Sequence, residues 1–231
     1  MRTRVYVSQP LPDEDIHVFG RPIDDNTKEL NKKMVNGIKS FVFDTFFAED
    51  TIERAFARFW TLETVARMPY FSYLSVLHLY ETLGWWRRSD YLKIHFLQTW
   101  NEQHHLLIME ELHGNRVWTD RFLAQHIAVV YYFLGLAFYV VNPTFAYNFN
   151  QAVEEEAFQT YDNFVSKHEA FLRDQPAPST AKRYYLEDPW FAETGSRARP
   201  TMQTLLDTFY AIRDDEAEHA ETMVKMQEEA L

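Results

Sequence analysis

The sequence contains no cysteine. That absence excludes disulfide bonds and thiolate-bound metals, so any metal here would need carboxylate and imidazole ligands. Glycine is also scarce, because the 231 residues hold only six, with none between Gly37 and Gly84 or between Gly135 and Gly195. Stretches of this length without glycine favour long helices over turn-rich β-structure.

Positive charge is in short supply as well. The 23 lysines and arginines face 34 acids, and the net charge of -11 argues against a nucleic-acid-binding protein. The start of the chain has no apolar core of the signal-peptide type and too many acids for a transit peptide. Aromatic residues, in contrast, reach 16%. Such a surplus serves a large core, an interface or a membrane surface, and it favours a homodimer.

No segment carries a strand pattern, so the predicted fold class is all-α. Residues 1–27 are expected to form an extended acidic arm, and residues 28–231 a single helical domain. The hydrophobic periodicity and the breakers predict a kink at Pro69, a helix start capped by Ser89 or Asp90, and a helix stop at Gly114. The helices are expected at 28–47, 51–83, 90–113, 120–141, 143–174 and 201–231, with a linker at 174–180 and an irregular segment at 181–200.

Two segments raise the question of a membrane. Residues 122–141 are mostly apolar, but Gln125 and His126 leave 15 uninterrupted residues, fewer than the roughly 20 that span the hydrocarbon. We therefore expect a buried bundle helix there. The segment 28–47 combines lysines with phenylalanines. That pattern suits a helix lying on a membrane, and it equally suits an ordinary surface helix packed on the bundle.

Four Glu-x-x-His pairs occur in the chain: Glu14/His17, Glu102/His105, Glu110/His113 and Glu216/His219. On a helix this spacing places both side chains on one face, where they can bind one metal ion. The first pair lies in the acidic arm, and the third lies in the last turn before Gly114, where a histidine can face the helix C-terminus. The second and fourth pairs lie within apolar stripes, where unpaired polar groups are costly. A hydrogen-bonded core histidine would explain one such pair, whereas two on two helices indicate a metal site.

A two-metal bundle with carboxylate ligands needs one further inward glutamate from each of the other two helices. Glu63 meets this need because it shares a helix face with Phe56 and Tyr70. Of three consecutive acids near residue 155, only Glu154 shares a face with apolar and aromatic residues. Four glutamates would balance the charge of two divalent ions. Oxygen and nitrogen ligands without sulfur suit iron or manganese.

Two polar residues next to the ligand glutamates are candidates for an outer layer of the site. Asn101 precedes Glu102, and Asp215 precedes Glu216. Hydrogen bonds from such residues commonly orient metal-bound histidines. We therefore expect Asn101 and Asp215 to bond the histidines across the bundle.

Six stretches of the chain resemble the alternative oxidase family, and within it the plastid terminal oxidase branch. They are "LETVARMPYFSYLSVLHLYETLGWWRRSDYLK", "WNEQHHLLIMEELHGN", "DRFLAQHIAVVYYF", "VEEEAFQTYD", "PAPSTAKRYY" and "IRDDEAEH". The resemblance implies a ferritin-like four-helix bundle with a carboxylate-bridged di-iron centre. It also implies that the family's ligands fall on the six positions chosen above, which are Glu63, Glu102, His105, Glu154, Glu216 and His219.

The resemblance implies further roles that the residues alone do not establish. The family's redox-active tyrosine falls on Tyr161, and other functional positions fall on Tyr139 and His78. Asp215 matches an aspartate of the outer layer. The positions that the resemblance assigns to quinol binding are Arg58, Leu62, Glu155, Ala157 and Thr160.

The resulting expectation is a non-haem di-iron quinol oxidase with two iron ions per chain. It would oxidise plastoquinol or a related quinol, reduce O2 to water and resist cyanide. It would lie on one side of a thylakoid or cytoplasmic membrane, in a bacterial or cyanobacterial cell or a plastid. Two alternatives stay open at this point: a soluble di-iron oxidase of the desaturase type, and a non-enzymatic bundle that stores iron or carries oxygen.

Overall fold

The computed structural model describes residues 20–47, 51–191 and 198–230. These residues are helical and, apart from an isolated bridge between Pro176 and Thr204, contain no β-structure, so the all-α prediction is confirmed. The short helix α7 (Ser179–Lys182) continues into a π-helix, η1 (Arg183–Glu187). The long helices are α1 (Asp25–Phe46), α2 (Ile52–Ala66), α3 (Met68–Leu83), α4 (Ser89–Glu111), α5 (Trp118–Val141), α6 (Pro143–Asp174) and α9 (Leu205–Glu229).

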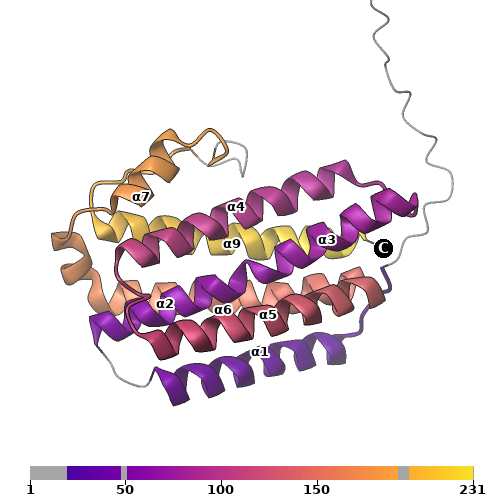
Figure 1. Ribbon diagram of the computed structural model, residues 1–231, viewed down its shortest axis with the longest axis horizontal. Coiled ribbons are helices and arrows are strands. Elements are labelled where there is room, and N and C mark those ends of the chain that lie inside the picture. The colour runs from indigo at the N-terminus through magenta and orange to yellow at the C-terminus, as the bar shows by residue number, and fades with distance from the viewer. Residues whose placement is uncertain (1–19, 48–50, 192–197, 231) are drawn as a thin grey trace, which may run out of the picture.

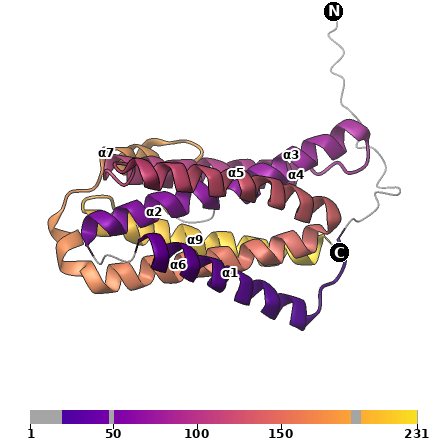
Figure 2. The same cartoon turned by 60° about the horizontal axis from the view of Figure 1, so that its bottom comes forward.

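Four helical rods form the central bundle, and α3 extends α2 as one of them (Figure 1). The other three rods are α4, α6 and α9, and α6 and α9 lie side by side along much of their length. Two further helices cover the bundle, α5 against α2 and α3, and α1 against α6 (Figures 1 and 2). This arrangement brings four helices from distant parts of the chain around one interior.

The expected kink at Pro69 is a break between two helices. α2 ends at Ala66, and Arg67 links it to α3 with helical backbone angles of φ -68° and ψ -16°. Pro69 lies in the first turn of α3, where a missing backbone N–H costs no helical hydrogen bond. The chain can therefore bend without a loop.

Three helix starts differ from the sequence prediction. The carboxylate of Asp24 accepts from the backbone N–H of Thr27 at 2.7 Å, so α1 begins at Asp25 and the arm is shorter than expected. Residues 1–19 of the arm lie outside the described residues. Neither Ser89 nor Asp90 caps α4, whose N-cap is Arg88. The last helix begins at Leu205, after a capping box formed by Thr204 and Asp207.

The prediction of irregular structure is wrong at its start, because residues 181–187 are helical in α7 and η1. The reason is a contact distant in the sequence. Glu111, at the end of α4, accepts from the backbone N–H groups of Ser179 and Thr180 at 2.7 and 2.8 Å. Burial alone would raise the pKa of Glu111, but these hydrogen bonds outweigh it and lower the pKa to about 2. A carboxylate from another helix thus caps α7, which a local pattern does not reveal.

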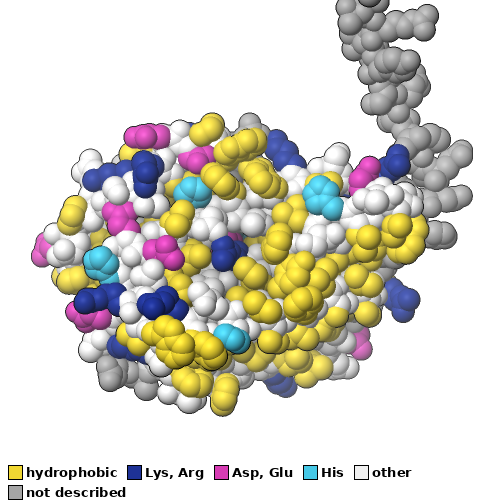
Figure 3. All heavy atoms as spheres, in the orientation of Figure 1, with side chains coloured by type: hydrophobic (Ala, Val, Ile, Leu, Met, Phe, Trp, Pro, Cys, Tyr) yellow, Lys and Arg dark blue, Asp and Glu magenta, His cyan; other side chains and the backbone are white. Residues whose placement is uncertain are grey.

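The prediction that α5 is a buried bundle helix is also wrong. Among the described residues it is the one helix long and apolar enough to cross a membrane, and only 22% of its most apolar window is buried. Its inner face is narrow and includes Gly135, where a Cβ atom would lie 2.8 Å from the Ser72 hydroxyl oxygen of α3. Its outer faces expose large apolar side chains, such as Phe133 and Val141. Figure 3 shows apolar side chains gathered where α5 and α3 cross this face of the molecule.

Candidate metal centre

The bundle interior brings together all six residues predicted as metal ligands. α2 contributes Glu63, α4 contributes Glu102 and His105, α6 contributes Glu154, and α9 contributes Glu216 and His219. Each is at most 6% exposed. The helical periodicity that selected these residues therefore has a direct structural counterpart, because each lies on the face that its helix turns inward.

The six side chains form two overlapping groups of four. One group contains Glu63 and His105, the other contains Glu154 and His219, and both contain Glu102 and Glu216. Within each group one ligand atom per residue lies within 4.8 Å of the others. Two glutamates shared between two groups are the arrangement needed to bridge two metal ions, with the unshared residues at either end.

The histidines direct the same ring nitrogen toward this centre. His105 Nδ1 lies 3.3 Å from Glu216 Oε1 and 3.6 Å from Glu63 Oε2. His219 Nδ1 lies 2.9 Å from Glu102 Oε1. The opposite nitrogen of His105, Nε2, bonds to Asp215 Oδ2 at 3.0 Å. A carboxylate that accepts from Nε2 fixes the tautomer that leaves Nδ1 free to bind a metal ion.

Whether a metal fits can be judged from the atoms that lack hydrogen-bond partners. Eight buried ligand atoms form no hydrogen bond of acceptable geometry, although several lie close to one another: one oxygen each of Glu63 and Glu154, both oxygens of Glu102 and Glu216, and Nδ1 of both histidines. Buried polar atoms without partners cost about 1–3 kcal/mol each, and most native proteins contain few. Here they all face one interior volume, and each is a metal-ligand atom. The donor set, with four carboxylates and two imidazoles, fits two divalent ions such as iron or manganese.

The electrostatics of Glu102, Glu154, Glu216 and His219 agree with that fit. Burial raises the pKa of Glu102 and Glu154 well above the ordinary value, and the neighbouring glutamates raise it further. Burial and Glu102 raise the pKa of Glu216 to about 8. Burial lowers the pKa of His219 to about 4, which keeps the imidazole neutral as a ligand must be. Four acids in one dry space repel one another, and divalent cations would relieve that repulsion.

Asp215 is the hub of the outer layer. It accepts from His105, from the Tyr185 hydroxyl at 2.8 Å and from the Asn101 amide at 2.9 Å. The prediction that Asn101 bonds a histidine is wrong, because its amide instead donates to Asp215 and, at 2.8 Å, to the Tyr184 hydroxyl. Asn101 thus acts on the histidine only through the aspartate.

Two tyrosines hold the two outer glutamates. Tyr161 donates to Glu63 Oε1, and Tyr70 donates to Glu154 Oε1 at 2.7 Å. Both hydroxyls are fully buried, and burial with the nearby acids raises the pKa of each. Tyr70 was not predicted as a site residue. The sequence places it seven residues after Glu63, in the register of the inward face, but does not reveal its contact with Glu154 of α6.

The other two positions carried over from the family lie away from the ligands. Tyr139 is fully buried and its hydroxyl bonds to the Tyr147 hydroxyl at 2.7 Å. His78 is exposed on the outer side of α3. Neither contacts the six ligand residues in the described structure, so direct roles at the metal ions have no geometric support.

An apolar cavity of about 470 Å³ lies beside the centre, between α1, α2, α5 and α6. Three of the predicted quinol-binding residues line it: Leu62, Ala157 and Thr160. Arg58 is not among the lining residues. Its guanidinium lies over the ring of Phe43, and Phe43 lines the cavity. Thr61 also lines the cavity, and its buried hydroxyl has no hydrogen-bond partner.

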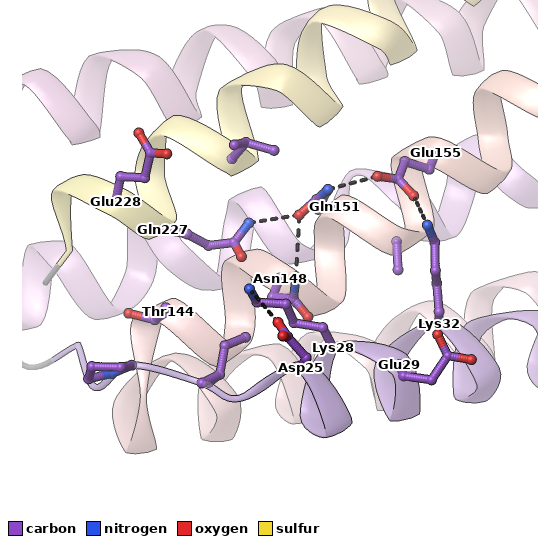
Figure 4. Close-up of a pocket in the computed structure, with 14 residues that line it drawn as sticks. Asp25, Lys28, Glu29, Lys32, Thr144, Asn148, Gln151, Glu155, Gln227 and Glu228 are labelled. Carbon is purple, nitrogen blue, oxygen red and sulfur yellow. Dashed lines mark hydrogen bonds and ion pairs between the residues drawn. The ribbon is translucent and has the colours of Figure 1, made fainter.

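Glu155 is the predicted quinol-binding residue that the structure separates from this cavity. Its carboxylate points away from the cavity, pairs with Lys32 of α1 at 2.9 Å and accepts from Gln151 at 2.7 Å (Figure 4). The next residue, Glu156, does line the apolar cavity and pairs there with Lys39. Adjacent residues on a helix point about 100° apart, so one position of difference decides which cavity an acid faces.

Comparison with known proteins was consistent with this geometry. Residues 20–228 match the family described as "Alternative oxidase". The chain is 49% identical over 201 residues to "Ubiquinol oxidase 4, chloroplastic/chromoplastic" of Arabidopsis thaliana, covering 83% of this chain and 57% of that protein. It is 29% identical to "Ubiquinol oxidase" of Trachipleistophora hominis, covering 84% and 55%. It is 31% identical to "Ubiquinol oxidase 1a, mitochondrial" of Oryza sativa subsp. japonica, covering 79% and 51%. The chain thus spans a little over half the length of these relatives.

Proposed function

This chain belongs to the alternative oxidase family, and we propose that it is a di-iron quinol oxidase that couples quinol oxidation to the reduction of O2 to water. Two quinols would be oxidised to quinones for each O2 that becomes two waters. The observation that carries the proposal is the set of eight unpartnered ligand atoms, drawn from four helices, next to an apolar cavity. A plastoquinol is the preferred donor because of the similarity to the chloroplast relative.

In this proposal the six ligand residues hold two iron ions, which supply O2 binding and electron transfer when bound. The protein fixes the ligands before any ion arrives. Asp215 holds the tautomer of His105, and Tyr70 and Tyr161 each occupy one oxygen of an outer glutamate. Tyr161 keeps its hydroxyl proton at Glu63 Oε1, at a position from which it can deliver both a proton and an electron. Its ring stacks on Phe59 at 4.3 Å, which helps to keep water away.

The quinol would bind in the apolar cavity. Leu62 is adjacent to the ligand Glu63 in the chain, and Thr160 is adjacent to Tyr161, so the cavity wall is one residue removed from the centre on two helices. The unpartnered Thr61 hydroxyl and the Glu156 carboxylate are suited to hydrogen-bond the quinol hydroxyls. We expect Thr61→Val to raise the KM for quinol and leave the iron content unchanged, because it removes a polar contact from the cavity alone.

The membrane part of the proposal rests on exposed apolar side chains. α1 exposes Ile38 and Phe41, and α5 exposes Val130 and Phe133, each at 52% or more. These two helices flank the apolar cavity, so a quinol could enter it from the lipid. We propose that the protein lies on one leaflet of a thylakoid or cytoplasmic membrane through α1 and α5, and that it does so as a homodimer. Flotation with liposomes and light scattering in detergent test these two statements.

One assay separates this proposal from its two alternatives. The purified chain is loaded with iron, and O2 uptake is measured with decylplastoquinol or decylubiquinol in the presence of cyanide. We expect bound iron near two per chain and cyanide-resistant uptake with a quinol. Iron binding without quinol-dependent uptake would instead favour a soluble di-iron oxidase or an iron-storing bundle. A folded chain that binds no iron would contradict the site itself.

A further inference from the structure

A cluster of buried rings extends from the Glu154 end of the metal centre, and the proposed quinol chemistry makes no use of it. This ring cluster comprises residues from α3, α4, α5 and α6 that are at most 2% exposed: Tyr70, Tyr73, His95, Tyr139 and Tyr147. Tyr70 starts the cluster by donating to Glu154. Phenol rings buried this deeply usually satisfy their hydroxyls. Here Tyr73 donates to the Ala146 carbonyl, and the hydroxyls of Tyr139 and Tyr147 bond to each other.

The rings are close enough to act in series. The ring of His95 lies 6.1 Å from that of Tyr70 and 5.6 Å from that of Tyr147. Tyr73 fills the space between them, 5.3 Å from both His95 and Tyr147, and Tyr139 stacks on it at 4.7 Å. The cluster therefore provides continuous aromatic contact leading away from the ligand Glu154.

A hydrogen-bonded base stands next to one of these phenols. Gln98 presents its carbonyl oxygen to His95 Nδ1 at 2.9 Å, so Nδ1 carries the hydrogen and Nε2 is the acceptor. The Tyr147 hydroxyl lies 3.0 Å from this Nε2 and accepts in turn from Tyr139 at 2.7 Å. Burial lowers the pKa of His95 to about 4, which agrees with a neutral acceptor. Tyr147 can thus lose its proton along a preformed bond when it loses an electron.

The route continues from the cluster to the surface. Tyr91 lies 6.4 Å from His95, and Trp86 lies 5.5 Å from Tyr91. The ring of Tyr80 lies 6.5 Å from that of Trp86 and 5.9 Å from that of Trp85. Trp85 is 53% exposed. Apart from His95, which bridges Tyr70, Tyr147 and Tyr91, every ring along this path is a phenol or an indole, the two kinds of ring that are most readily oxidised.

The other end of the centre is built differently. Tyr161 packs against the rings of Phe59 and Phe209. A phenyl ring does not give up an electron under conditions that oxidise a phenol or an indole. The phenyl rings beside Tyr161 therefore confine a tyrosyl radical near the metal ions. The rings beside Tyr70 can instead be oxidised in turn, so a radical can move away from the centre.

We propose that the ring cluster carries oxidising equivalents away from the metal ions when O2 is bound and no quinol is present. This transfer would protect the residues around the centre from oxidation. The inference rests on the proposed oxidase function. Complete reduction of O2 takes four electrons, of which a reduced di-iron centre holds two, and a missing quinol leaves two to be found. The two electrons can be supplied one at a time: Tyr147 loses an electron toward the centre and its proton to His95 Nε2, and the same phenol gives the second electron after it has been reduced again. The protons of the two waters come from solvent. A one-electron reductant of the ascorbate class then restores the rings at Trp85, and the proton returns.

The test determines which residues become oxidised when quinol is withheld. Iron content and quinol-dependent O2 uptake are measured first on the full-length wild type, because a failure there contradicts the proposed function and not only the route. The reduced, iron-loaded protein is then exposed to O2 without quinol, with and without ascorbate. Oxidised tyrosines and tryptophans are located by peptide mass spectrometry, and radicals are detected by electron paramagnetic resonance after rapid freezing. We expect oxidation at Tyr147, Trp86 and Trp85, and its loss when ascorbate is present.

Matched variants decide the path. Tyr147→Phe keeps the ring volume and should keep the quinol-saturated rate. It removes the phenol that passes its proton to His95, so oxidation at Trp86 and Trp85 should fall and inactivation should come sooner when quinol is limiting. Tyr91→Phe lies further from the centre and should lose oxidation at the tryptophans while keeping it at Tyr147. Tyr132→Phe, which removes a hydroxyl outside the route, should behave as the wild type. Equal oxidation at Tyr132 and Tyr147 in the wild type, or an unchanged pattern in both route variants, would overturn the inference.

Discussion

Two Glu-x-x-His pairs lie eight residues apart, one within helix α4 and one at its C-terminal end, and they have different structural roles. Glu102 and His105 are fully buried and meet acids from α2, α6 and α9. Glu110 is half-buried and accepts from the Trp60 indole at 3.3 Å. The local spacing is the same in both pairs. What makes one of them a candidate metal site is therefore the set of side chains that other helices bring to it.

The second pair belongs to the end of the helix. His113 has a left-handed backbone with φ 64°, and its N–H donates to the Glu110 carbonyl at 2.9 Å. The N–H of Gly114 donates to the Met109 carbonyl at 2.9 Å. Together these bonds form a Schellman motif, in which His113 takes the position usually held by glycine. Gly114, predicted as the helix stop, is instead required by a close contact with α2.

The largest expected effect comes from exchanging a carboxylate in each pair. Glu102→Gln should abolish quinol-driven O2 uptake and reduce the bound iron, because Glu102 belongs to both ligand groups. Glu110→Gln is the matched control and should retain both properties. Iron analysis and an oxygen electrode measure them. Equal losses in the two variants would mean that the comparison between the pairs is wrong.

The next largest effect concerns Asp215, the hydrogen-bond partner of His105. Asp215→Asn removes the carboxylate that accepts from His105, and we expect iron affinity to fall about 10- to 100-fold. Competition with a chelator measures this change. Asp214→Asn alters the neighbouring acid, which pairs with Arg213 at the surface, and should leave the affinity unchanged. A similar fall in both variants would point to net charge and not to the hydrogen bond.

At the helix end, Gly114→Ala should lower the free energy of unfolding by about 2 kcal/mol. A Cβ atom there would lie 2.4 Å from the Phe56 carbonyl oxygen and 2.7 Å from Trp60 Cβ, so α2 would have to move. Gly37→Ala on α1 meets nothing within 4 Å and should raise the same free energy by about 0.5–1 kcal/mol. Urea unfolding of both variants tests the two signs.

A smaller effect is expected from Glu111→Ala, which removes the cap of α7 and should lower the free energy of unfolding by about 1 kcal/mol at neutral pH. The folded pKa of about 2 lies below the ordinary value of 4.5. The stabilisation is therefore fully present above pH 4.5 and is lost as the pH falls toward 2. Urea unfolding at several pH values should show wild type and variant converging in acid. A constant difference across this window would contradict the capping role.

The smallest effect is expected at His113. His113→Gly relieves the left-handed backbone of a side-chain-bearing residue, and the gain is partly offset by the greater freedom of glycine in the unfolded chain. We expect a rise of about 0.5 kcal/mol in the free energy of unfolding, with iron content unchanged. Any loss of iron in this variant would show that His113 takes part in the site.

The sequence predicted the helical fold and the set of residues that meet in the interior because both depend on periodicity. An inward glutamate is recognisable when the residues three and four positions away are apolar, as around Glu63 and Glu154. α5 was misjudged because a helix that is apolar on nearly all sides has no period to show which face is buried. α7 and Glu155 were misjudged because a cap from another helix and a lysine from α1 decided their structure. The role of Tyr70 could not be predicted from the sequence, because it depends on the contact between α3 and α6 at Glu154.

With iron as the bound metal, as proposed above, the eight ligand atoms without hydrogen-bond partners would make the fold responsive to iron supply. A chain that has not bound metal keeps four acids facing one another in a dry interior. Its free energy of unfolding is therefore lower than that of the metal-bound chain. Such a chain opens locally more often, and cellular proteases act on opened forms. The amount of this protein in a cell should therefore follow iron availability through the survival of the folded chain, without a separate regulator.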